Sequence, residues 1–414
     1  MIKNNPKVMV VFGTRPDAIK LAPLMKILES DPGFDFIPVD TGQHETRVTS
    51  ETLKFFDVKM KPTRLDVMKY KQTPNEVLYR VMAGISEAIS LSHPDVVVVQ
   101  GDTSSALAAA LAAFNLGVPV AHVEAGLRTW DIHNPWPEES NRLCIDRMSD
   151  MLFVPTASAF ANLRRENIEA NKEMIVGNTS VDSQLFCCQR IIEENFNLGR
   201  IYYSDIPHVF VTVHRRENFG KPIENICSVV RSIAVDHPDI NFVWPVHPNP
   251  NVRGTVPDLM KGYVNVTLCE PFDYLTSMFM VGTALMVMTD SGGVQEEAAG
   301  FAVPTIVLRE KTDRLEHEAA GRSRDRSMLI DYMASYKDKV KIVGHNPEMI
   351  AKEFSSVLKK SLERREKQDR TIPGIFGSFH PLYGDGLASQ RIAAHLRRRF
   401  GMEPELFPEP AVFQ

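Results

Sequence analysis

The chain has too few cysteines, and none of the ligand spacings, for a fold held by disulfides or by zinc. Only five of its 414 residues are cysteine, and no two of them form a CxxC pair. An odd number without that spacing argues against a disulfide framework and against structural zinc, and it favours a reducing compartment. No HExxH-type motif occurs either, so we expect no bound metal.

Long apolar runs and a strong charge of one sign are also missing. The most apolar long stretch, residues 106–123, is interrupted by Asn115, Gly117 and Pro119, which leaves it too polar to span a bilayer. The apolar run at residues 8–12 is too short for the core of a signal peptide. The net charge of −5 creates no basic field for nucleic acid or an anionic membrane. The sequence therefore predicts a soluble, cytoplasmic protein without nucleic-acid or membrane partners.

What the sequence does contain is a regular alternation of strands and helices. A length of 414 residues corresponds to two or three domains at roughly 150 residues each. Short apolar runs, followed by glycine-containing turns and then by helical periodicity, predict doubly wound parallel sheets. The expected strands are residues 7–12, 34–40, 95–99 and 118–123 in a first series and residues 208–213, 241–246, 285–289 and 304–308 in a second.

The two series indicate an α/β fold made of two domains in tandem. We place the boundary between Asp182 and Pro207. The expected division is residues 1–190 and 191–378, with residues 379–414 forming a C-terminal helix and tail that pack back on the first domain. Open parallel sheets bind ligands at the carboxyl ends of their strands, so two such domains facing each other would line one cleft with their polar turns.

The sharpest polar motif is DSGGVQEE at residues 290–297. Its glycines allow a ligand to approach the backbone, and the N–H groups at the start of the following helix form a natural phosphate site. Glu296 and Glu297 are expected in the first helical turn, where a carboxylate can reach a sugar hydroxyl. The competing interpretation is a capped helix whose acidic residues offset the helix dipole.

The turn after the first strand has the sequence GTRPD at residues 13–17. The chain lacks both GxGxxG and GxxxxGK[ST], so neither a dinucleotide fingerprint nor a P-loop is present. Arg15 and Lys20 can nevertheless clamp a phosphate. An arginine and a lysine on the surface of a helix start are the equally simple alternative.

Carboxylates gather after neighbouring strands of the first series. They are Asp102, Glu124 and the pair Glu138-Glu139. Carboxylates with shifted pKa values can act as general acid and general base. Asp102 has a simpler alternative role as the cap of the next helix, whereas a glutamate at the end of an apolar strand should be partnered or functional.

A dense ionic cluster, HRREN at residues 214–218, follows the first strand of the second series. His214 and its neighbours suit the binding of a diphosphate and the movement of a proton, and His247 follows the next strand. Four residues are candidates for a metal site that no ligand spacing supports: His122, Glu124, His214 and His247. Trp130 and Trp136 flank a loop, either as a platform for a sugar or, more simply, as packing residues.

Together these motifs resemble the UDP-N-acetylglucosamine 2-epimerase family, in order over about residues 7–395. The matching segments are GTRPDAIKLAPL (13–24), TGQH (41–44), GDTSSALAAALAAF (101–114), HVEAGLRT (122–129), PWPEESNR (135–142), VGNTSVD (176–182), VTVHRREN (211–218), PVHPNPNVR (245–253), DSGGVQEEA (290–298) and YGDGLASQRI (383–392). Such an ordered series is far more specific than any single motif.

The resemblance implies the GT-B fold, in which two Rossmann-like doubly wound domains face each other across a cleft. It implies epimerisation at C2 of UDP-N-acetylglucosamine, or of a modified UDP-2-acetamido sugar. The reaction proceeds by anti elimination of UDP to 2-acetamidoglucal and re-addition of UDP. The resemblance also implies a homodimer, a role in polysaccharide biosynthesis, and no nicotinamide or other cofactor. Hydrolysing relatives release UDP and N-acetylmannosamine instead, and a GT-B glycosyltransferase is a further alternative.

The resemblance also implies which residues form the site. On the family pattern the catalytic residues are Asp102, Glu124, Glu138 and His214. The expected substrate-binding residues are Arg15, Lys20, Arg142, His247, Ser291, Gly292, Gly293, Glu297 and Arg314, with Glu297 at the ribose hydroxyls. These residue types fit an elimination that must stabilise a departing diphosphate and remove a poorly acidic proton. Which carboxylate removes the proton stays open.

The sequence departs from the family pattern near the expected nucleotide. Asp17 replaces a glutamate, Leu315 stands in place of a proline, and residues 320–326 are unusually charged. Ser277, with Phe279 two residues further on, occupies a place where a phenylalanine often packs against uracil. These departures concern the base and the sugar substituents, and they leave the expected catalytic residues intact.

A second, activating UDP-sugar site is present in many bacterial family members. Gln43 matches the pattern of that site, but Thr46 and Lys71 replace a glutamine and an arginine. We therefore expect substrate activation to be weak or absent.

Overall fold

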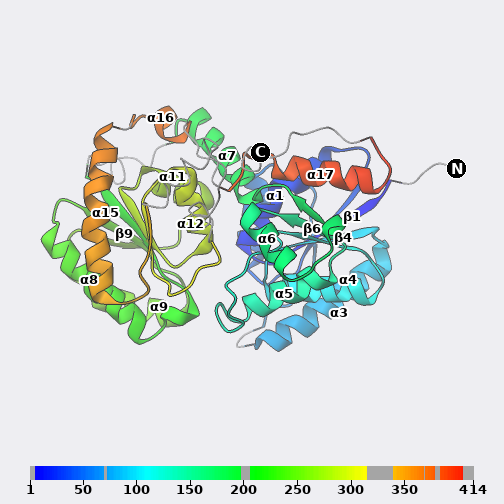
Figure 1. Ribbon diagram of the computed structural model, residues 1–414, viewed down its shortest axis with the longest axis horizontal. Helices are drawn as coiled ribbons and strands as arrows, with labels where there is room; N and C mark the ends of the chain where they lie inside the picture. The colour runs from blue at the N-terminus through cyan, green and yellow to red at the C-terminus, as the bar shows by residue number, and fades with distance from the viewer. Residues whose placement is uncertain are drawn as a thin grey trace. The chain divides into compact units, whose positions relative to one another are not determined.

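The computed structural model describes residues 5–69, 72–196, 206–314, 339–367, 369–377 and 383–403. The chain forms two compact units. The first comprises the chain up to Ser183 together with the chain from Tyr383 onward, and the second runs from Gln184 to Leu382. This division falls inside helix α7 (Thr179–Glu193), as does the expected boundary after residue 190. Figure 1 shows a sheet with flanking helices in each unit.

The first unit contains a seven-stranded parallel sheet in the order β3-β2-β1-β4-β5-β6-β7. Its strands are β1 (Lys7–Phe12), β2 (Asp35–Asp40), β3 (Thr63–Arg64), β4 (Val96–Gln100), β5 (Val120–Val123), β6 (Met151–Val154) and β7 (Glu173–Ile175). Besides the start of α7, its helices are α1 (Arg15–Ser30), α2 (Thr46–Phe55), α3 (Pro74–Ser92), α4 (Ser104–Asn115), α5 (Glu138–Met148), α6 (Ala157–Arg165) and α17 (Ala388–Arg399).

The second unit contains a six-stranded parallel sheet in the order β10-β9-β8-β11-β12-β13. Its strands are β8 (His208–Thr212), β9 (Asn241–Pro245), β10 (Val266–Cys269), β11 (Met286–Thr289), β12 (Thr305–Val307) and β13 (Val340–Ile342). Its helices are α8 (Lys221–Asp236), α9 (Pro250–Arg253), α10 (Val256–Met260), α11 (Tyr274–Thr283), α12 (Gly292–Gly300), α15 (Pro347–Lys367) and α16 (Ile372–Phe376).

Both sheets have the strand order of a doubly wound Rossmann fold. The order reverses between β1 and β4 in the first sheet and between β8 and β11 in the second, where the paired strands are parallel. Ligands of such sheets bind outside the carboxyl ends of the strands at this switch point. The turns after these four strands are therefore where a site is expected, and most of the polar motifs follow them.

The strands predicted from the sequence are all present, with ends shifted by at most two residues. The sequence missed β3, β6, β7, β10 and β13. These strands are two to four residues long, at or below the length at which an apolar run can be recognised.

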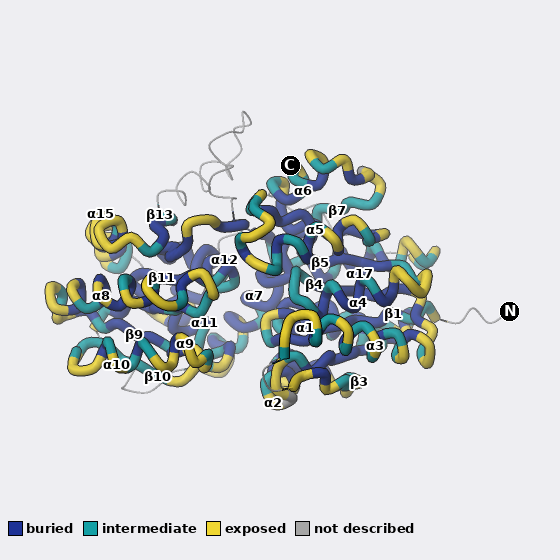
Figure 2. Tube along the Cα trace, turned by 90° about the horizontal axis from the view of Figure 1, so that it is seen from below, coloured by how far each residue is buried: buried dark blue, intermediate teal, exposed yellow. Residues whose placement is uncertain are grey.

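The core of the first unit follows from the composition of its central strands. β4 has the sequence VVVVQ with every residue buried, as expected for a parallel strand covered on both faces. The alanines of α4 are buried, and their small side chains allow close packing against α3. In Figure 2 the central strands β4 and β5 are dark blue, while the outer sides of the helices are yellow.

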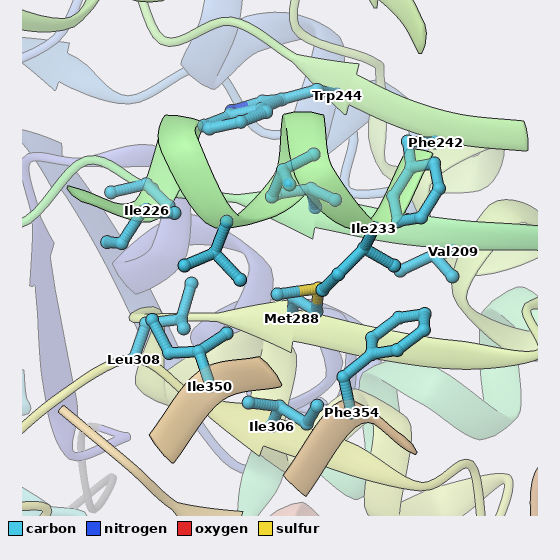
Figure 3. Packing of buried hydrophobic residues seen from close by; sticks show 14 of the residues in the cluster. Val209, Ile226, Ile233, Phe242, Trp244, Met288, Ile306, Leu308, Ile350 and Phe354 are labelled. Atoms are coloured by element: carbon cyan, nitrogen blue, oxygen red, sulfur yellow. The ribbon is translucent and has the colours of Figure 1, made fainter. Parts of the chain in front are cut away.

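The core of the second unit lies between its sheet and the helices α8 and α15. Figure 3 shows Ile226 and Ile233 of α8 and Phe354 of α15 around the strand side chains. The rings of Phe242 and Phe354 stack with centroids 6.1 Å apart. Trp244 is among the largest fully buried side chains of the described chain.

The C-terminal helix α17 returns to the first unit and lies beside α1 (Figure 1). Arg397 of α17 forms an ion pair with Asp31, directly after α1. Asp182 accepts hydrogen bonds from the backbone N–H of Ser389 at 2.7 Å and of Ala388 at 3.3 Å. This carboxylate therefore caps the first turn of α17 from a distant part of the chain. Within the described ranges, no helix is both long and apolar enough to cross a membrane.

Candidate functional site

The turn after β1 is built for close approach. A Cβ atom on Gly13 would lie 2.2 Å from Thr41 Oγ1, so no other residue fits there. Thr14 caps α1 and forms a capping box with Asp17. Arg15 is the first residue of α1, and its backbone N–H donates to His44 Nδ1 at 3.1 Å.

A buried ion pair joins α1 to the end of β5. Lys20 Nζ lies 2.5 Å from Glu124 Oε2, with both side chains almost fully buried. Gln100, the last residue of β4, donates its amide N–H to the same carboxylate oxygen. Glu124 has a φ of +69°, a conformation that costs a non-glycine residue about 1–3 kcal/mol. This conformation is held in place by the contacts that α1 and β4 make with the carboxylate.

A second ion pair follows β4. Arg142 of α5 is paired with Asp102 and lies 3.7 Å from Glu139. Asn141 donates its side-chain amide to the backbone oxygen of Asp102 at 2.8 Å. The alternative role of Asp102 as a helix cap is wrong, because Thr103 caps α4 through the backbone N–H of the residue three positions on.

The two neighbouring glutamates at the start of α5 have different environments. Glu138 is the first residue of the helix and is partly exposed. Glu139 is buried and accepts hydrogen bonds from the backbone N–H of Thr129 at 3.0 Å and of Trp130 at 3.1 Å. Burial raises the pKa of Glu139, although Arg142 acts in the opposite direction. Glu139 therefore holds the loop before α5.

The tryptophans of that loop are not core residues. Trp130 is 45% exposed and Trp136 is 48% exposed, so the protein covers each ring only in part. The Arg165 guanidinium lies 4.2 Å from the centroid of the Trp130 ring, within the range of a cation–π contact.

His122 belongs to a buried network rather than to an open site. Its ring nitrogens lie 2.7 Å from Asp146 Oδ1 and 2.8 Å from the backbone oxygen of Gly101. Neither nitrogen faces a ligand, so His122 does not join Glu124, His214 and His247 in the candidate metal site. Among the residues that the structure describes, no group of three or more His, Cys, Asp or Glu side chains is placed to hold a metal ion.

In the second unit, Asp290 organises the turns after β8 and β11. Its buried carboxylate accepts hydrogen bonds from the backbone N–H of His214 at 2.9 Å and of Arg215 at 2.8 Å, and from the Asn218 amide at 2.9 Å. Asn218 also donates to the backbone oxygen of Leu308, after β12. Asp290 and Asn218 together therefore connect the ends of β8, β11 and β12.

Two histidine rings stack beside this carboxylate. The rings of His214 and His247 are 5.2 Å apart at 22°, and His214 Nδ1 lies 3.6 Å from Asp290 Oδ1. Burial lowers the pKa of His214 to about 4, although Asp290 acts in the opposite direction. Burial also lowers the pKa of His247. Both rings are therefore neutral at pH 7.

The start of α12 has the geometry of a phosphate site. Ser291 at the N-cap makes no capping hydrogen bond with its side chain, and Gly292 and Gly293 begin the helix. A Cβ atom on Gly292 would lie 3.3 Å from the Arg314 guanidinium carbon. A positive side chain and a helix N-terminus thus meet at one place, as anion sites require.

The acidic residues of this motif differ from expectation. Glu296 and Glu297 are in the second turn of α12, because the helix begins only at Gly292. Glu296 is buried and pairs with Arg314 at 2.7 Å, and Asp313 pairs with the same guanidinium. Glu296 therefore positions an arginine, whereas Glu297 is only partly buried.

Among the residues that differ from the family pattern near the expected nucleotide base, the position of Phe279 is clear. Phe279 is buried, and its ring stacks with that of Phe376 at 5.6 Å, so it is a core residue and does not substitute for a phenylalanine against uracil. Ser277 lies in α11 and is partly buried. Leu315 and the charged residues 320–326 lie outside the described residues.

Comparison with known proteins identifies the family. A sequence model described as UDP-N-acetylglucosamine 2-epimerase matches residues 26–397. A probable UDP-N-acetylglucosamine 2-epimerase of Ralstonia solanacearum is 38% identical over 401 residues, which are 95% of this chain and 99% of the relative. The chain belongs to the UDP-N-acetylglucosamine 2-epimerase family.

Solved structures of UDP-GlcNAc 2-epimerases have the same fold. The enzyme from Neisseria meningitidis, bound to UDP-GlcNAc, has a TM-score of 0.83 at 33% identity, with 95% of this chain and 100% of that chain covered. The enzyme from Methanocaldococcus jannaschii, in complex with UDP-GlcNAc and UDP, has a TM-score of 0.79 at 31% identity, with 95% and 99% covered. The prediction of an α/β fold with two Rossmann-like domains is confirmed.

The residues expected from the epimerase pattern form separate groups in the two units. Those in the first unit are Arg15, Lys20, Asp102, Glu124, Glu138 and Arg142. Those in the second unit are His214, His247, Ser291, Gly292, Gly293, Glu297 and Arg314. The structure pairs Lys20 with Glu124 and Arg142 with Asp102.

Sequence analysis missed the residues that hold these groups in place. Gln100 and Asp146 are buried polar residues whose partners lie 18 to 24 positions away in the sequence. One signal was available, because Gln100 is the single polar residue at the end of the VVVVQ strand. For Asp146, which lies on a helix of mixed polarity, no comparable signal exists.

Proposed function

We propose that the protein epimerises C2 of UDP-N-acetylglucosamine, or of a modified UDP-2-acetamido sugar, without net hydrolysis. One observation carries the proposal. Two carboxylates, Asp102 and Glu124, lie at neighbouring strand ends of the first sheet, each ion-paired with a basic residue that the epimerase pattern also expects. Relatives that are 31–38% identical are named or crystallised as UDP-GlcNAc 2-epimerases.

The proposed reaction has two half-steps. In the first, a carboxylate takes the C2 proton, the C–H electron pair becomes the C1–C2 double bond of 2-acetamidoglucal, and the C1–O bond breaks. The electron pair of that bond leaves with UDP. In the second, UDP adds back to C1 while a proton reaches C2 on the opposite face, which gives the manno epimer.

The first unit supplies the groups for proton transfer. Glu124, paired with Lys20, and Asp102, paired with Arg142, are the two candidates to accept the C2 proton. Glu138 is partly exposed at the start of α5 and is the third candidate acid or base. Positioned acid–base groups of this kind contribute about 10²–10⁴-fold each. Arg15 completes the basic residues proposed to contact substrate here.

The second unit supplies the groups for the leaving diphosphate. The start of α12 and Arg314 would stabilise the negative charge that develops on the departing UDP. Nδ1 of His214 faces Asp290 Oδ1 at 3.6 Å, so a hydrogen bond to a diphosphate oxygen would come from Nε2, and the neutral ring donates it in the tautomer that carries its one proton there. Glu297 is proposed to accept hydrogen bonds from the ribose hydroxyls. His247 is proposed to support the His214 ring, against which it stacks.

The first test follows the C2 proton directly. In deuterium oxide, proton NMR of the enzyme with UDP-N-acetylglucosamine should show loss of the C2 proton signal together with a second UDP-sugar. Free N-acetylmannosamine and UDP would instead identify the hydrolysing reaction. Neither exchange nor product, with this sugar or with a panel of modified UDP-sugars, would contradict an epimerase.

Matched variants assign the exchange to the site. Asp102→Asn and Glu124→Gln should each slow exchange by at least about 10²-fold. Glu51→Gln is the control, because Glu51 is an exposed glutamate that is also ion-paired, with Arg47 on α2. Equal rates for all three variants would mean that the carboxylates at the strand ends take no part in the reaction.

The remaining expectations from the family are proposals of the same kind. We propose a cytoplasmic homodimer that works without a cofactor in polysaccharide biosynthesis. Sedimentation at several protein concentrations tests the dimer, and activity after exhaustive treatment with a chelator tests the independence from metal.

A further inference from the structure

A network of ionisable side chains, three of which have no solvent exposure, lies in the first unit, next to the candidate catalytic carboxylates. Asp146 of α5 contacts the His122 ring at 2.7 Å and the Arg128 guanidinium at 2.7 Å. Arg128 also donates to Glu166 at 2.7 Å and 2.8 Å through two nitrogens. The side chains of His122, Asp146 and Arg128 are completely buried.

The backbone atoms that this network holds flank the carboxylates. The backbone oxygen of Gly101, which faces His122 Nε2 at 2.8 Å, belongs to the residue just before Asp102. Asp146 Oδ2 accepts the backbone N–H of Gly126 at 3.2 Å, two residues after Glu124. His122 itself lies two residues before Glu124.

Glu124 is therefore held from both sides. Asp146 contacts both His122 and Gly126, so one carboxylate holds the two ends of the segment in which Glu124 has a positive φ. The same histidine connects that segment to the turn that carries Asp102. A hydrophobic core in this place could not fix backbone donors and acceptors in this way.

We propose that His122, Asp146 and Arg128 are positioning residues for the epimerase reaction, which set the separation and direction of the Asp102 and Glu124 carboxylates. The inference rests on the proposed function, since it assigns both carboxylates to the chemistry. None of the three touches the reacting atoms. They act through the turn after β4 and through the segment after β5.

Two substitutions of His122 separate its two contacts. In His122→Asn the amide nitrogen takes the place of Nδ1, so the contact with Asp146 is kept and the contact with Gly101 is lost. In His122→Gln the amide nitrogen takes the place of Nε2, so the contact with Gly101 is kept and that with Asp146 is lost. Asp146→Asn tests the other end of the network at constant shape.

We expect the variants to lower kcat without changing the affinity for UDP. The three variants should lose about 10²-fold in kcat, the size of effect expected when a reacting group is displaced by about 1 Å. The affinity for UDP, measured by calorimetry, should stay unchanged, because the helix start and Arg314 proposed to hold the diphosphate belong to the second unit, and the variants replace none of the basic residues that the first unit is proposed to contribute. His395→Asn is the matched control, a half-buried histidine of α17 that contacts Phe153.

A double substitution tests the route of action. If His122 acts through Asp102, adding His122→Asn to Asp102→Asn should cost far less than it does in the wild-type background. A merely structural histidine would give independent, multiplicative losses, and that result would overturn the proposal. So would an unchanged kcat in all variants, or a loss of UDP affinity equal to the loss of kcat.

The wild-type protein separates this inference from the proposed function. Absence of C2 exchange by the wild type rejects the epimerase reaction before any variant is measured. An active wild type with indifferent network variants rejects only the positioning role. Should the histidine variants fail to fold, Arg128→Lys, which keeps the buried charge but loses the fork to Asp146 and Glu166, gives the same kcat comparison.

Discussion

At the scale of single residues, the carboxyl group of Asp17 is the clearest case of a charge placed by its neighbours. It accepts hydrogen bonds from the backbone N–H of Gly13 at 3.3 Å and of Thr14 at 3.2 Å, and Thr103 approaches it at 3.5 Å. It connects the turn after β1 to the turn after β4. Burial nevertheless raises the pKa of Asp17 from 3.8 to about 6, since these donors offset the desolvation only in part.

The raised pKa of Asp17 makes the free energy of unfolding depend on pH. The folded state binds the Asp17 proton below about pH 6, whereas the unfolded chain binds it only near pH 3.8. The free energy of unfolding that Asp17 contributes therefore rises as the pH falls from above 6 towards 4, and the ionised form destabilises the fold at pH 8. A difference of about two pKa units corresponds to about 3 kcal/mol.

We expect Asp17→Asn to be more stable than the wild type at pH 8, by up to about 3 kcal/mol. The amide oxygen can still accept the backbone N–H groups, and no charge is buried. The advantage should stay near its maximum from pH 8 down to about pH 7 and then shrink between about pH 6 and pH 4, the interval bounded by the pKa of Asp17 in the folded and in the unfolded state. Urea unfolding at several pH values measures it, with Asp35→Asn as an exposed control; a difference that does not change with pH would contradict the assignment.

At the scale of elements, the start of α12 offers two adjacent glycines with different surroundings. A Cβ on Gly292 would meet the Arg314 guanidinium at 3.3–3.6 Å, whereas a Cβ on Gly293 would come no closer than 4.0 Å to its nearest neighbour, Ser291 Oγ. The first position is restricted by the protein itself. The second is restricted only if a ligand approaches the helix start.

This contrast gives a paired prediction for the diphosphate site. Gly292→Ala should weaken UDP binding because Arg314 must move, and Gly293→Ala should weaken it only because a methyl group would meet the diphosphate. We expect a loss of roughly tenfold, about 1.4 kcal/mol, for each. Calorimetric titration with UDP measures both losses, and thermal unfolding of the free protein should be nearly unchanged for Gly293→Ala. Wild-type affinity in the Gly293→Ala variant would move the diphosphate away from this helix.

The elements also show how far a sequence determines a fold. Strands such as β1 and β4 were predicted because a short run of valines and other apolar residues indicates a buried parallel strand without knowledge of its neighbours. β3, with two residues, and β7, with three, exist only because a neighbouring strand pairs with them. Their short length carries no local pattern, so the sheet edges had to come from the structure.

At the scale of the whole molecule, the same limit applies to the candidate site. The residues at strand ends were predictable, since polar side chains after apolar strands stand out. Their partners were not: Lys20 lies 104 positions before Glu124, and Arg142 lies 40 positions after Asp102. Long-range pairs of this kind depend on how the sheet is wound. The helix after residue 290 was predicted, but Glu296 and Glu297 were expected in its first turn, whereas the structure has them in its second turn.

Regulation is the remaining property of the whole molecule that the sequence addresses. Of the positions expected at an activating UDP-sugar site, Gln43 accepts a hydrogen bond from Ser105 at 2.6 Å through its amide oxygen. Thr46 begins α2, and Lys71 lies outside the described residues. A threonine is shorter than a glutamine, and a lysine lacks the fork with which an arginine holds a diphosphate in two bonds.

We therefore expect the rate with UDP-N-acetylmannosamine alone to depend hyperbolically on its concentration, with added UDP-N-acetylglucosamine acting only as a competing substrate. An activator works by binding the active state better than the inactive one, so a ligand that has lost its contacts shifts nothing. Initial rates measured with and without a trace of UDP-N-acetylglucosamine test this. A long lag that the trace abolishes would show that the activating site is intact.

Substitutions in the opposite direction should restore activation. If the two replacements alone weaken activation, the double variant Thr46→Gln and Lys71→Arg should acquire it, with a sigmoidal rate curve that becomes hyperbolic when UDP-N-acetylglucosamine is added. Activation of five- to 150-fold corresponds to the usual coupling of 1–3 kcal/mol between two sites. A double variant that stays hyperbolic, beside a wild type that also does, would place the cause elsewhere in the chain, because the restored side chains would then be insufficient to couple the second site to the first.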